Sequence, residues 1–158
     1  MRLLNSICKV ISSKYSGVPV HIEEVPSGFK RDCFFVTLAT GGSSLLSKKV
    51  YEDNPTFQIV YFGKRDIANQ VDAEGLYKVK EELKALFLLA LAIPVIPLEG
   101  VKEKPRYAKI ETYTDELRLS EGALYIKLTL NFTEDVPTHE EYELIGDVNI
   151  VTKTVTNG

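Results

Sequence analysis

The strongest constraint on the fold is a strictly alternating segment in the second half of the sequence. Between positions 124 and 132 every second side chain is apolar: Leu124, Ile126, Leu128, Leu130 and Phe132. Polar or amphipathic residues fill the positions between them. Because successive side chains of a strand point to opposite faces, this pattern predicts a strand with one face in a core and the other toward solvent. Any fold of this chain must accommodate this half-buried strand.

Further strands are expected over 18–25, 33–40, 50–62, 107–114 and 116–119, where β-branched and aromatic residues lie between turn residues. We expect the first two to form a hairpin. The turn at 120–123 should join the run 116–119 to the alternating strand 124–132 in another hairpin. The stretch 41–49, rich in Gly, Ser and Lys, reads as a flexible loop.

Two helices are expected from apolar residues at three-to-four spacing. The first opens the chain and ends near residues 15–17; its apolar positions are Leu3, Leu4, Ile7, Val10, Ile11 and Tyr15. The second begins at a cap, Asp66 or Asn69, and continues for over five turns, with Ile67, Val71, Leu76, Val79, Leu83, Leu86, Phe87 and Ala90 on its apolar face.

These elements predict an α+β fold: a mixed or antiparallel sheet packed by the N-terminal amphipathic helix and a long central helix. We expect one domain over residues 1–133, because 158 residues can bury a core without disulfides or metals. Residues 134–158 form an acidic C-terminal extension with a charge of −5, which leaves +2 for the rest of a chain of net charge −3. We expect this extension to add an arm-like strand to a neighbouring molecule.

No motif for catalysis, a cofactor or a metal is complete. The run from Gly42 to Lys49 resembles a phosphate loop, yet it lacks the second glycine and the hydroxyl residue after the lysine. His139 has no second histidine four residues on, and the adjacent acids Glu23-Glu24 and Glu81-Glu82 point in different directions. Cys33 reads as a small core residue without a nearby base. The sequence therefore predicts a protein that is not an enzyme and holds no cofactor or metal.

Assembly with other proteins fits the sequence better. The apolar pair Leu45-Leu46 lies in a polar stretch and suits a docking loop, although the same pair would also suit a loop folded back on its own core. We expect basic residues at loops and strand ends to form a rim for an acidic protein surface, such as the extension of a neighbouring copy. These residues are Lys30, Arg31, Lys48, Lys49, Lys64 and Arg65. The candidate interface residues are Leu45, Leu46, Lys48, Lys49, Lys64, Arg65, Glu140 and Glu141.

Membranes and nucleic acid are not expected partners. The most apolar stretch, residues 85–93, is shorter than a membrane span, and the N-terminus shows no apolar signal core. The sequence has a pI near 5.5 and contains no known nucleic-acid-binding motif, which argues against specific nucleic-acid binding. With only two cysteines, Cys8 and Cys33, in no paired motif, a reduced compartment is expected.

The order of elements and several short phrases resemble the tail terminator family of Gram-positive phages and of phage-derived contractile tail particles. The resemblance covers roughly residues 3–133. It rests on Leu4-Asn5-Ser6-Ile7, Ile22-Glu23-Glu24-Val25, Gly28-Phe29-Lys30, Cys33-Phe34-Phe35-Val36, Phe57-Gln58-Ile59-Val60-Tyr61-Phe62, Glu81-Glu82-Leu83, Gly122-Ala123-Leu124-Tyr125-Ile126 and Asn131-Phe132.

This resemblance implies a structural protein whose copies form a hexameric ring on the head-proximal end of a tail tube. The ring would stop tube growth and, in contractile tails, engage the last sheath ring. Its implied partners are other copies of itself and the tube protein, with sheath and neck proteins as further candidates. The implied location is the bacterial host cytoplasm during assembly, and afterwards the tail particle.

Three other interpretations stay open at this point. A neck or head-tail connector of the same particle has a similar size and symmetry. A small cytoplasmic α+β enzyme would require a pocket of convergent titratable groups. A binding module that adds a strand to a partner would not form a closed ring.

Overall fold

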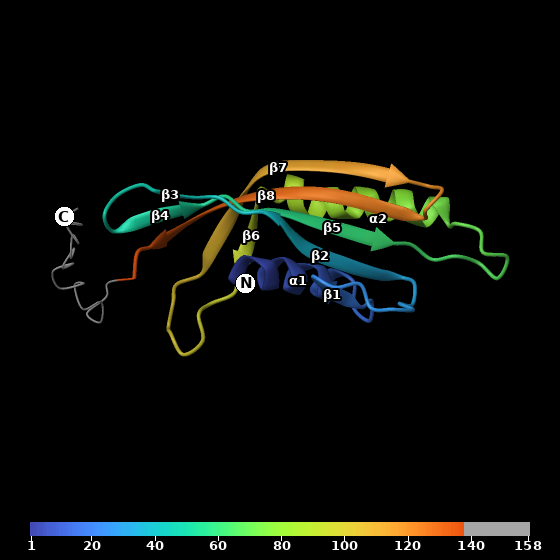
Figure 1. Cartoon of the computed structure of the whole chain (residues 1–158), viewed down its shortest axis with the longest axis horizontal. Helices are drawn as coiled ribbons and strands as arrows, with labels where there is room; N and C mark the ends of the chain where they lie inside the picture. Colours follow the sequence, from blue (N-terminus) through green and yellow to red (C-terminus); the bar gives the residue numbers. More distant parts are fainter. Residues whose placement is uncertain (138–158) are drawn as a thin grey trace, which may run out of the picture.

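The alternating segment forms β8 (Ala123–Asp135), the central strand of an eight-stranded sheet. The computed structural model describes residues 1–137 (Figure 1). The elements before β8 are α1 (Arg2–Lys14), β1 (Val20–Ile22), β2 (Cys33–Thr40), β3 (Ser43–Leu45), β4 (Val50–Asp53), β5 (Thr56–Phe62), α2 (Ala73–Lys84), the π-helical turn η1 (Ala85–Leu89), β6 (Ala92–Val95) and β7 (Arg106–Arg118).

The strands of the main sheet lie in the order β1-β2-β5-β8-β7-β6. Every neighbouring pair is antiparallel except β1 and β2, which run parallel. The hairpin expected from the first two strands is therefore wrong, because residues 23–32 carry the chain back before β2 starts. The hairpin of β7 and β8 is confirmed, with Arg118 opposite Ala123.

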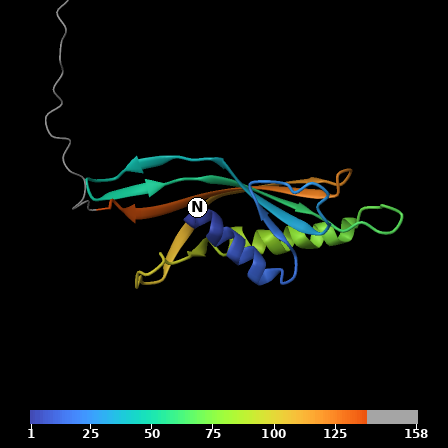
Figure 2. The ribbon, with the colours of Figure 1, turned by 60° about the horizontal axis from the view of Figure 1, so that its bottom comes forward.

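One face of the sheet, the inner face, is covered by both helices, which lie on the same side of it (Figure 2). The alternating apolar side chains of β8 point to this face and are buried against apolar residues of the helices, such as Ile7, Ile11, Leu76 and Leu83. The outer face carries no helix among the described residues. It holds only a small apolar cluster of Cys33, Phe35, Val60 and Ala123, packed by Phe29, Phe62 and Tyr125.

The expected α+β class with a long central helix is wrong. The described residues are mostly β, with 42% strand and 22% helix, and the sheet curls in the manner of a half-barrel. The first helix is present, but α2 has only 12 residues before η1. Residues 63–72 do not join it because they form a loop closed by a bridge between Arg65 and Val71. Ile67, an expected core position, is fully exposed in that loop.

α2 begins at a cap that neither Asp66 nor Asn69 provides. The Asp72 carboxylate accepts a hydrogen bond from the backbone N–H of Gly75 at 2.9 Å, which satisfies one of the free donors of the first turn. Asp72→Ala is expected to lower the free energy of unfolding by about 1 kcal/mol, measured by urea denaturation. Asp72→Asn keeps the acceptor and serves as control. Equal losses in both variants would contradict a capping role.

β2 with β3, and β4 with β5, form one long hairpin in which both strands are interrupted at the same level. The interruptions are Gly41-Gly42 and Asn54-Pro55, and the Asn54 N–H donates to the Gly42 carbonyl at 2.7 Å. The single strand expected over 50–62 is thus two strands, and the loop expected over 41–49 contains β3 and a tight turn.

The distal part of this hairpin, together with residues 132–135 of β8, forms a three-stranded projection that we call the arm (Figure 1). β8 continues through Glu134 and Asp135, which pair with Tyr51 and Val50. The first two residues of the expected acidic extension therefore belong to a strand. The remainder from residue 138 lies outside the described residues, and the division of the chain at residue 133 stays a prediction.

Candidate assembly surfaces

Arg2, at the start of α1, fastens the base of the arm to the body. Its Nη1 donates to Glu134 of β8 at 2.8 Å, its Nη2 pairs with Glu103, and its Nε donates to the Ile96 carbonyl at 2.8 Å. All three partners are far from Arg2 in sequence. Because an arginine fork binds several acceptors in fixed directions, this side chain sets how α1, the segment after β6 and the arm meet.

Phe132 lies where β8 passes from the body into the arm. Its ring is buried, with the guanidinium of Arg106 at 4.4 Å and that of Arg2 at 5.5 Å from its centroid. Arg106 also donates to the Thr133 carbonyl. Apolar burial and two cation–π contacts thus combine at the junction of arm and body.

Tyr51 of β4 completes this junction by donating from its hydroxyl to Glu134 at 2.7 Å. The hydrogen bond to the carboxylate, with burial as a second cause, raises the pKa of Tyr51 to about 12. Burial is the main cause that raises the pKa of Tyr15, Tyr61 and Tyr113 of the inner face as well. Each of these groups holds its proton more tightly in the folded chain.

Stability is therefore expected to decline in alkali. A tyrosine whose pKa is above its unfolded value of about 10 contributes stability that is fully present below pH 10 and is lost as the pH rises toward the folded pKa. Urea denaturation between about pH 8 and pH 11 is expected to show this decline. Tyr51→Phe should make the decline shallower, whereas Tyr77→Phe, at an exposed position on α2, is the matched control. A flat profile up to pH 11 would contradict the assignment.

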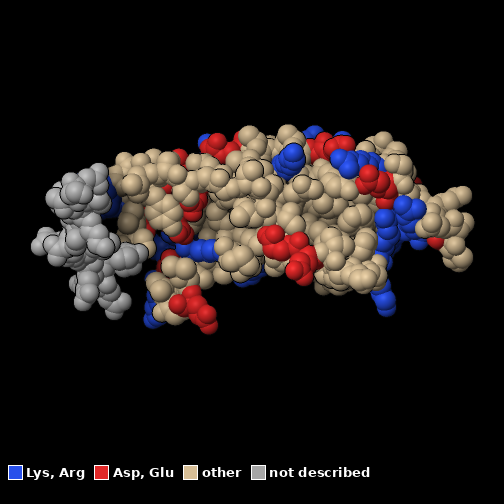
Figure 3. Space-filling model, viewed as in Figure 1, with Lys and Arg blue, Asp and Glu red and all other residues tan. Residues whose placement is uncertain are grey.

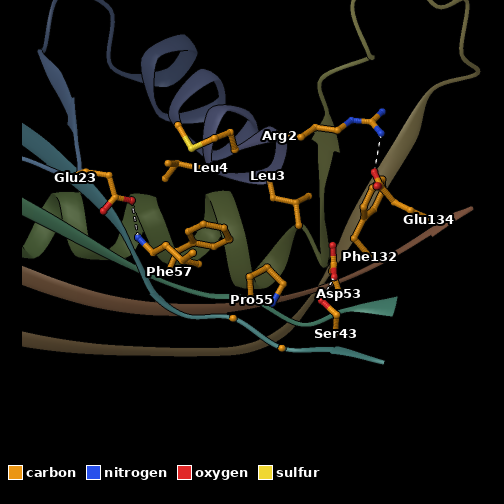
Figure 4. Close-up of a pocket in the computed structure, with 14 residues that line it drawn as sticks. Arg2, Leu3, Leu4, Glu23, Ser43, Asp53, Pro55, Phe57, Phe132 and Glu134 are labelled. Carbon is orange, nitrogen blue, oxygen red and sulfur yellow. Dashed lines mark hydrogen bonds and ion pairs between the residues drawn. The ribbon is translucent and has the colours of Figure 1, made fainter. Parts of the chain in front are cut away.

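A hollow of about 350 Å³ lies at the base of the arm, beside the N-terminus of α1 (Figure 4). Apolar groups from the body and acidic groups from the arm both line it. In Figure 4 Glu134 is reached by Arg2 and Asp53 lies beside Ser43. The lining residues are Met1, Arg2, Leu3, Leu4, Glu23, Leu38, Gly41, Gly42, Ser43, Asp53, Pro55, Phe57, Phe132 and Glu134.

The tip of the arm exposes apolar side chains. Leu45 ends β3 and is 75% exposed, and Leu46 begins the following turn and is 57% exposed. Backbone N–H groups of Leu46 and Ser47 both donate to the Val50 carbonyl at 3.0 Å, so the turn has a defined shape. Lys48 and Lys49 in the same turn are exposed. The leucines do not fold back on the core, and the tip is a docking candidate.

A second candidate surface lies at the opposite end of the molecule, around the loop that follows β5 (Figure 3). It is a hollow of about 540 Å³ lined by Phe29, Arg31, Lys64, Arg65 and Asn69, which we call the cationic hollow. Arg31 and Arg65 both donate to the Glu121 carbonyl, at 2.9 and 3.1 Å. Burial and the charge of Arg65 lower the pKa of Arg31. Repulsion between these guanidinium groups favours an anion beside them.

The structure places the sequence-predicted residues in two groups. Leu45, Leu46, Lys48 and Lys49 lie at the arm tip, whereas Lys64 and Arg65 line the cationic hollow at the other end. The expected single basic rim is therefore divided. Glu140 and Glu141 lie outside the described residues. Arg31, which the sequence places in the basic rim but not among the candidate interface residues, lies beside Lys64 and Arg65 in the cationic hollow.

The residues considered for catalysis have ordinary structural roles. The run from Gly42 to Lys49 leads into β4 and offers no helix N-terminus to a phosphate. Cys33 is buried, and burial raises the pKa of its thiol, which disfavours the nucleophilic thiolate. Glu82 accepts a hydrogen bond from Tyr15 at 2.8 Å, and Glu23 accepts one from the backbone of Leu38 at 3.1 Å. Within residues 1–137 no group of three metal-ligating side chains is found.

Comparison with known proteins assigns the chain to a family. The model of a family described as phage tail terminator protein matches residues 2–143, which includes the whole described structure after Met1. The match extends ten residues beyond residue 133, further than the resemblance seen in the sequence phrases. No curated protein matches the chain. Among residues 1–137, neither the length nor the hydropathy of any helix suffices for a membrane span. The chain therefore belongs to the phage tail terminator family, a family of structural proteins of the phage tail.

Proposed function

We propose that this protein forms a closed, hexameric ring on the head-proximal end of a phage tail tube and thereby ends the addition of tube subunits. Membership of the tail terminator family supports this role. The structural observation that carries it is the presence of two unlike surfaces at opposite ends of one elongated protomer, the arm tip and the cationic hollow (Figure 1).

Unlike surfaces favour a ring over a two-fold dimer. A two-fold interface uses the same patch on both subunits, whereas head-to-tail contacts join different patches and generate a ring when the rotation closes. The arm tip offers exposed leucines, and the opposite end offers a hollow flanked by cations. The two ends therefore differ in chemistry, as a head-to-tail contact between successive protomers requires.

The free edges of the sheet also suit a protein that stops growth. The edge strands β1 and β3 have three residues each, and β6 has four with an exposed Pro94 among them. Short edges and proline discourage the addition of further strands. A cap built from such protomers presents little template on which another subunit would continue.

The proposed partners are copies of the same chain and the tail tube protein, with the sheath and neck proteins as candidates at the outer and head-facing sides. Assembly would take place in the bacterial host cytoplasm, and the protein would remain in the finished tail. No step of this role involves covalent chemistry. The arm is the proposed docking element, through Leu45, Leu46, Lys48 and Lys49.

Deletion of the gene from its native host, followed by electron microscopy of released particles, tests the proposal. Overlong tubes without heads are the expected result, because nothing would stop tube growth. Headless tubes of normal length would assign the protein to the neck instead. Unaltered particles would contradict a role in the tail. Re-expression of the unmodified chain is the control and should restore tube length.

A further inference from the structure

Three cationic side chains of the cationic hollow have no carboxylate partner within residues 1–137. None of the ion pairs of the described chain involves Arg31, Lys64 or Arg65. The two arginines instead donate to backbone carbonyls: Arg31 to Gly63, Glu121 and Gly122, and Arg65 to Asn69 and Glu121. These bonds hold the guanidinium groups in place but leave their charge uncompensated.

The acidic side chains near the hollow interact with groups other than its three cations. Glu121 accepts from the Tyr125 hydroxyl at 2.7 Å and faces Arg118, Asp32 accepts from Tyr61, and Asp66 accepts from the backbone of Gln70. These carboxylates thus support local structure and do not neutralise the positive charge of the hollow. A ligand that brings its own negative charges would complete the site.

The hollow is also built to keep its arginine in position. The guanidinium of Arg31 lies over the ring of Phe62, at 5.2 Å from the centroid. Gly122 has a positive φ of 63°, and a Cβ added there would lie 2.8 Å from Nη1 of Arg31. Any larger residue at position 122 would therefore displace this side chain. Planar arginine forks fixed in this way suit carboxylate groups of a peptide.

We propose that the cationic hollow binds the acidic C-terminal segment of a neighbouring copy of this chain. The segment beyond the described residues contains Glu140, Glu141, Glu143 and Asp147 but only one lysine. The described strand that precedes it, β8, ends at Asp135 in the arm, opposite to the hollow (Figure 1). In a head-to-tail ring the arm end of one copy faces the hollow of the next, so the segment reaches its neighbour's hollow. This inference rests on the proposed ring.

Zero-length cross-linking of the full chain tests this contact. A carbodiimide couples a lysine amine to a carboxylate only where the two touch. Equal amounts of unlabelled and 15N-labelled protein are mixed, cross-linked and analysed by mass spectrometry. The expected products join Lys64 to Glu140 or Glu141 in peptide pairs that contain one labelled and one unlabelled partner. Lys64→Arg keeps the charge and should lose these products completely.

A charge exchange supplies a second test that does not depend on one lysine. Glu140→Lys together with Glu141→Lys should abolish the cross-links, because like charges then face each other. Adding Lys64→Glu to this variant should restore coupling between the same positions, with amine and carboxylate exchanged. Lys127→Glu, on the exposed outer face of β8, is the matched control that should restore nothing.

Three results would overturn the inference. Cross-links confined to peptides of equal labelling would place the segment on its own chain, and absence of cross-links to position 64 would remove the hollow as its site. Binding of a duplex DNA oligonucleotide that is lost in Lys64→Glu, without cross-links between copies, would assign the hollow to nucleic acid. Cross-linking reports the contact and gene deletion reports the function, so the failure of one is distinguishable from the failure of the other.

Discussion

Replacing Leu45 and Leu46 together by aspartate is expected to give a folded protein that no longer stops tail growth, so that its host releases overlong tubes. Both side chains are more than half exposed at the arm tip and contribute little to the core. Two carboxylates in an apolar contact would have to be buried without partners, at a cost of several kcal/mol. The expected defect is therefore as large as that of gene deletion.

The measurement is electron microscopy of particles from a deletion host that expresses each variant. The matched control adds the same two charges at exposed apolar positions outside both proposed contact surfaces, Val101→Asp with Leu89→Asp. Thermal unfolding followed by circular dichroism should show the same midpoint for both variants as for the unmodified chain, within a few degrees. Tubes of normal length with the Leu45 and Leu46 variant would remove the arm tip from the interface.

Phe132→Ala is expected to cause the largest loss of stability among single substitutions at the arm junction. The ring is buried and contacts two guanidinium groups, and its removal leaves a cavity at the point where arm and body meet. Truncation of a buried phenylalanine costs about 3–5 kcal/mol. For a chain of this size the melting temperature should fall by about 10 °C.

Urea denaturation at neutral pH measures this loss directly. Phe132→Leu keeps most of the apolar volume and should lose less, which separates cavity formation from loss of the aromatic ring. Tyr107→Ala removes an aromatic side chain that is 62% exposed and should leave the unfolding midpoint nearly unchanged. A midpoint for Phe132→Ala equal to that of Tyr107→Ala would show that the arm junction does not stabilise the fold.

The sequence predicts a strand best where burial of one face requires apolar and polar residues to alternate. β8 is such a strand, because a shift of one residue would expose Ile126 and Leu128. β2 was likewise expected at the bounds that it has in the structure. Local pattern does not report strand direction, and β1 was therefore paired wrongly: its ten-residue connection to β2 suits a hairpin as well as a return that makes the strands parallel.

The helix after β5 begins later than its apolar spacing predicts, for a different physical reason. Ile67 and Val71 match helical spacing, but Arg65 spans the loop by donating to the Asn69 carbonyl at 3.1 Å and by pairing with Val71. These bonds close the loop before α2 begins. Spacing alone cannot distinguish an apolar residue of a helix face from one at the tip of a closed loop.

The sequence predicted most residues of the candidate surfaces but not which of them lie together in the fold. Leu45 and Leu46 are docking candidates from sequence because apolar residues in a polar stretch are exposed unless the stretch folds back, and the structure exposes them. That Arg31 and Arg65 meet at the Glu121 carbonyl depends on three segments distant in sequence. Only the fold brings them together.

β8 has a mechanical consequence for a protein of a phage tail. It is the one long strand that pairs both with β5 and β7 in the body and with β4 in the arm, and its first residue directly follows Gly122 beside the cationic hollow. A pull on the arm tip therefore passes from β4 to β8 through their paired backbones and is then carried lengthwise along β8. Within the body, the hydrogen bonds of β8 to β5 and β7 share that load in shear up to the end beside the cationic hollow.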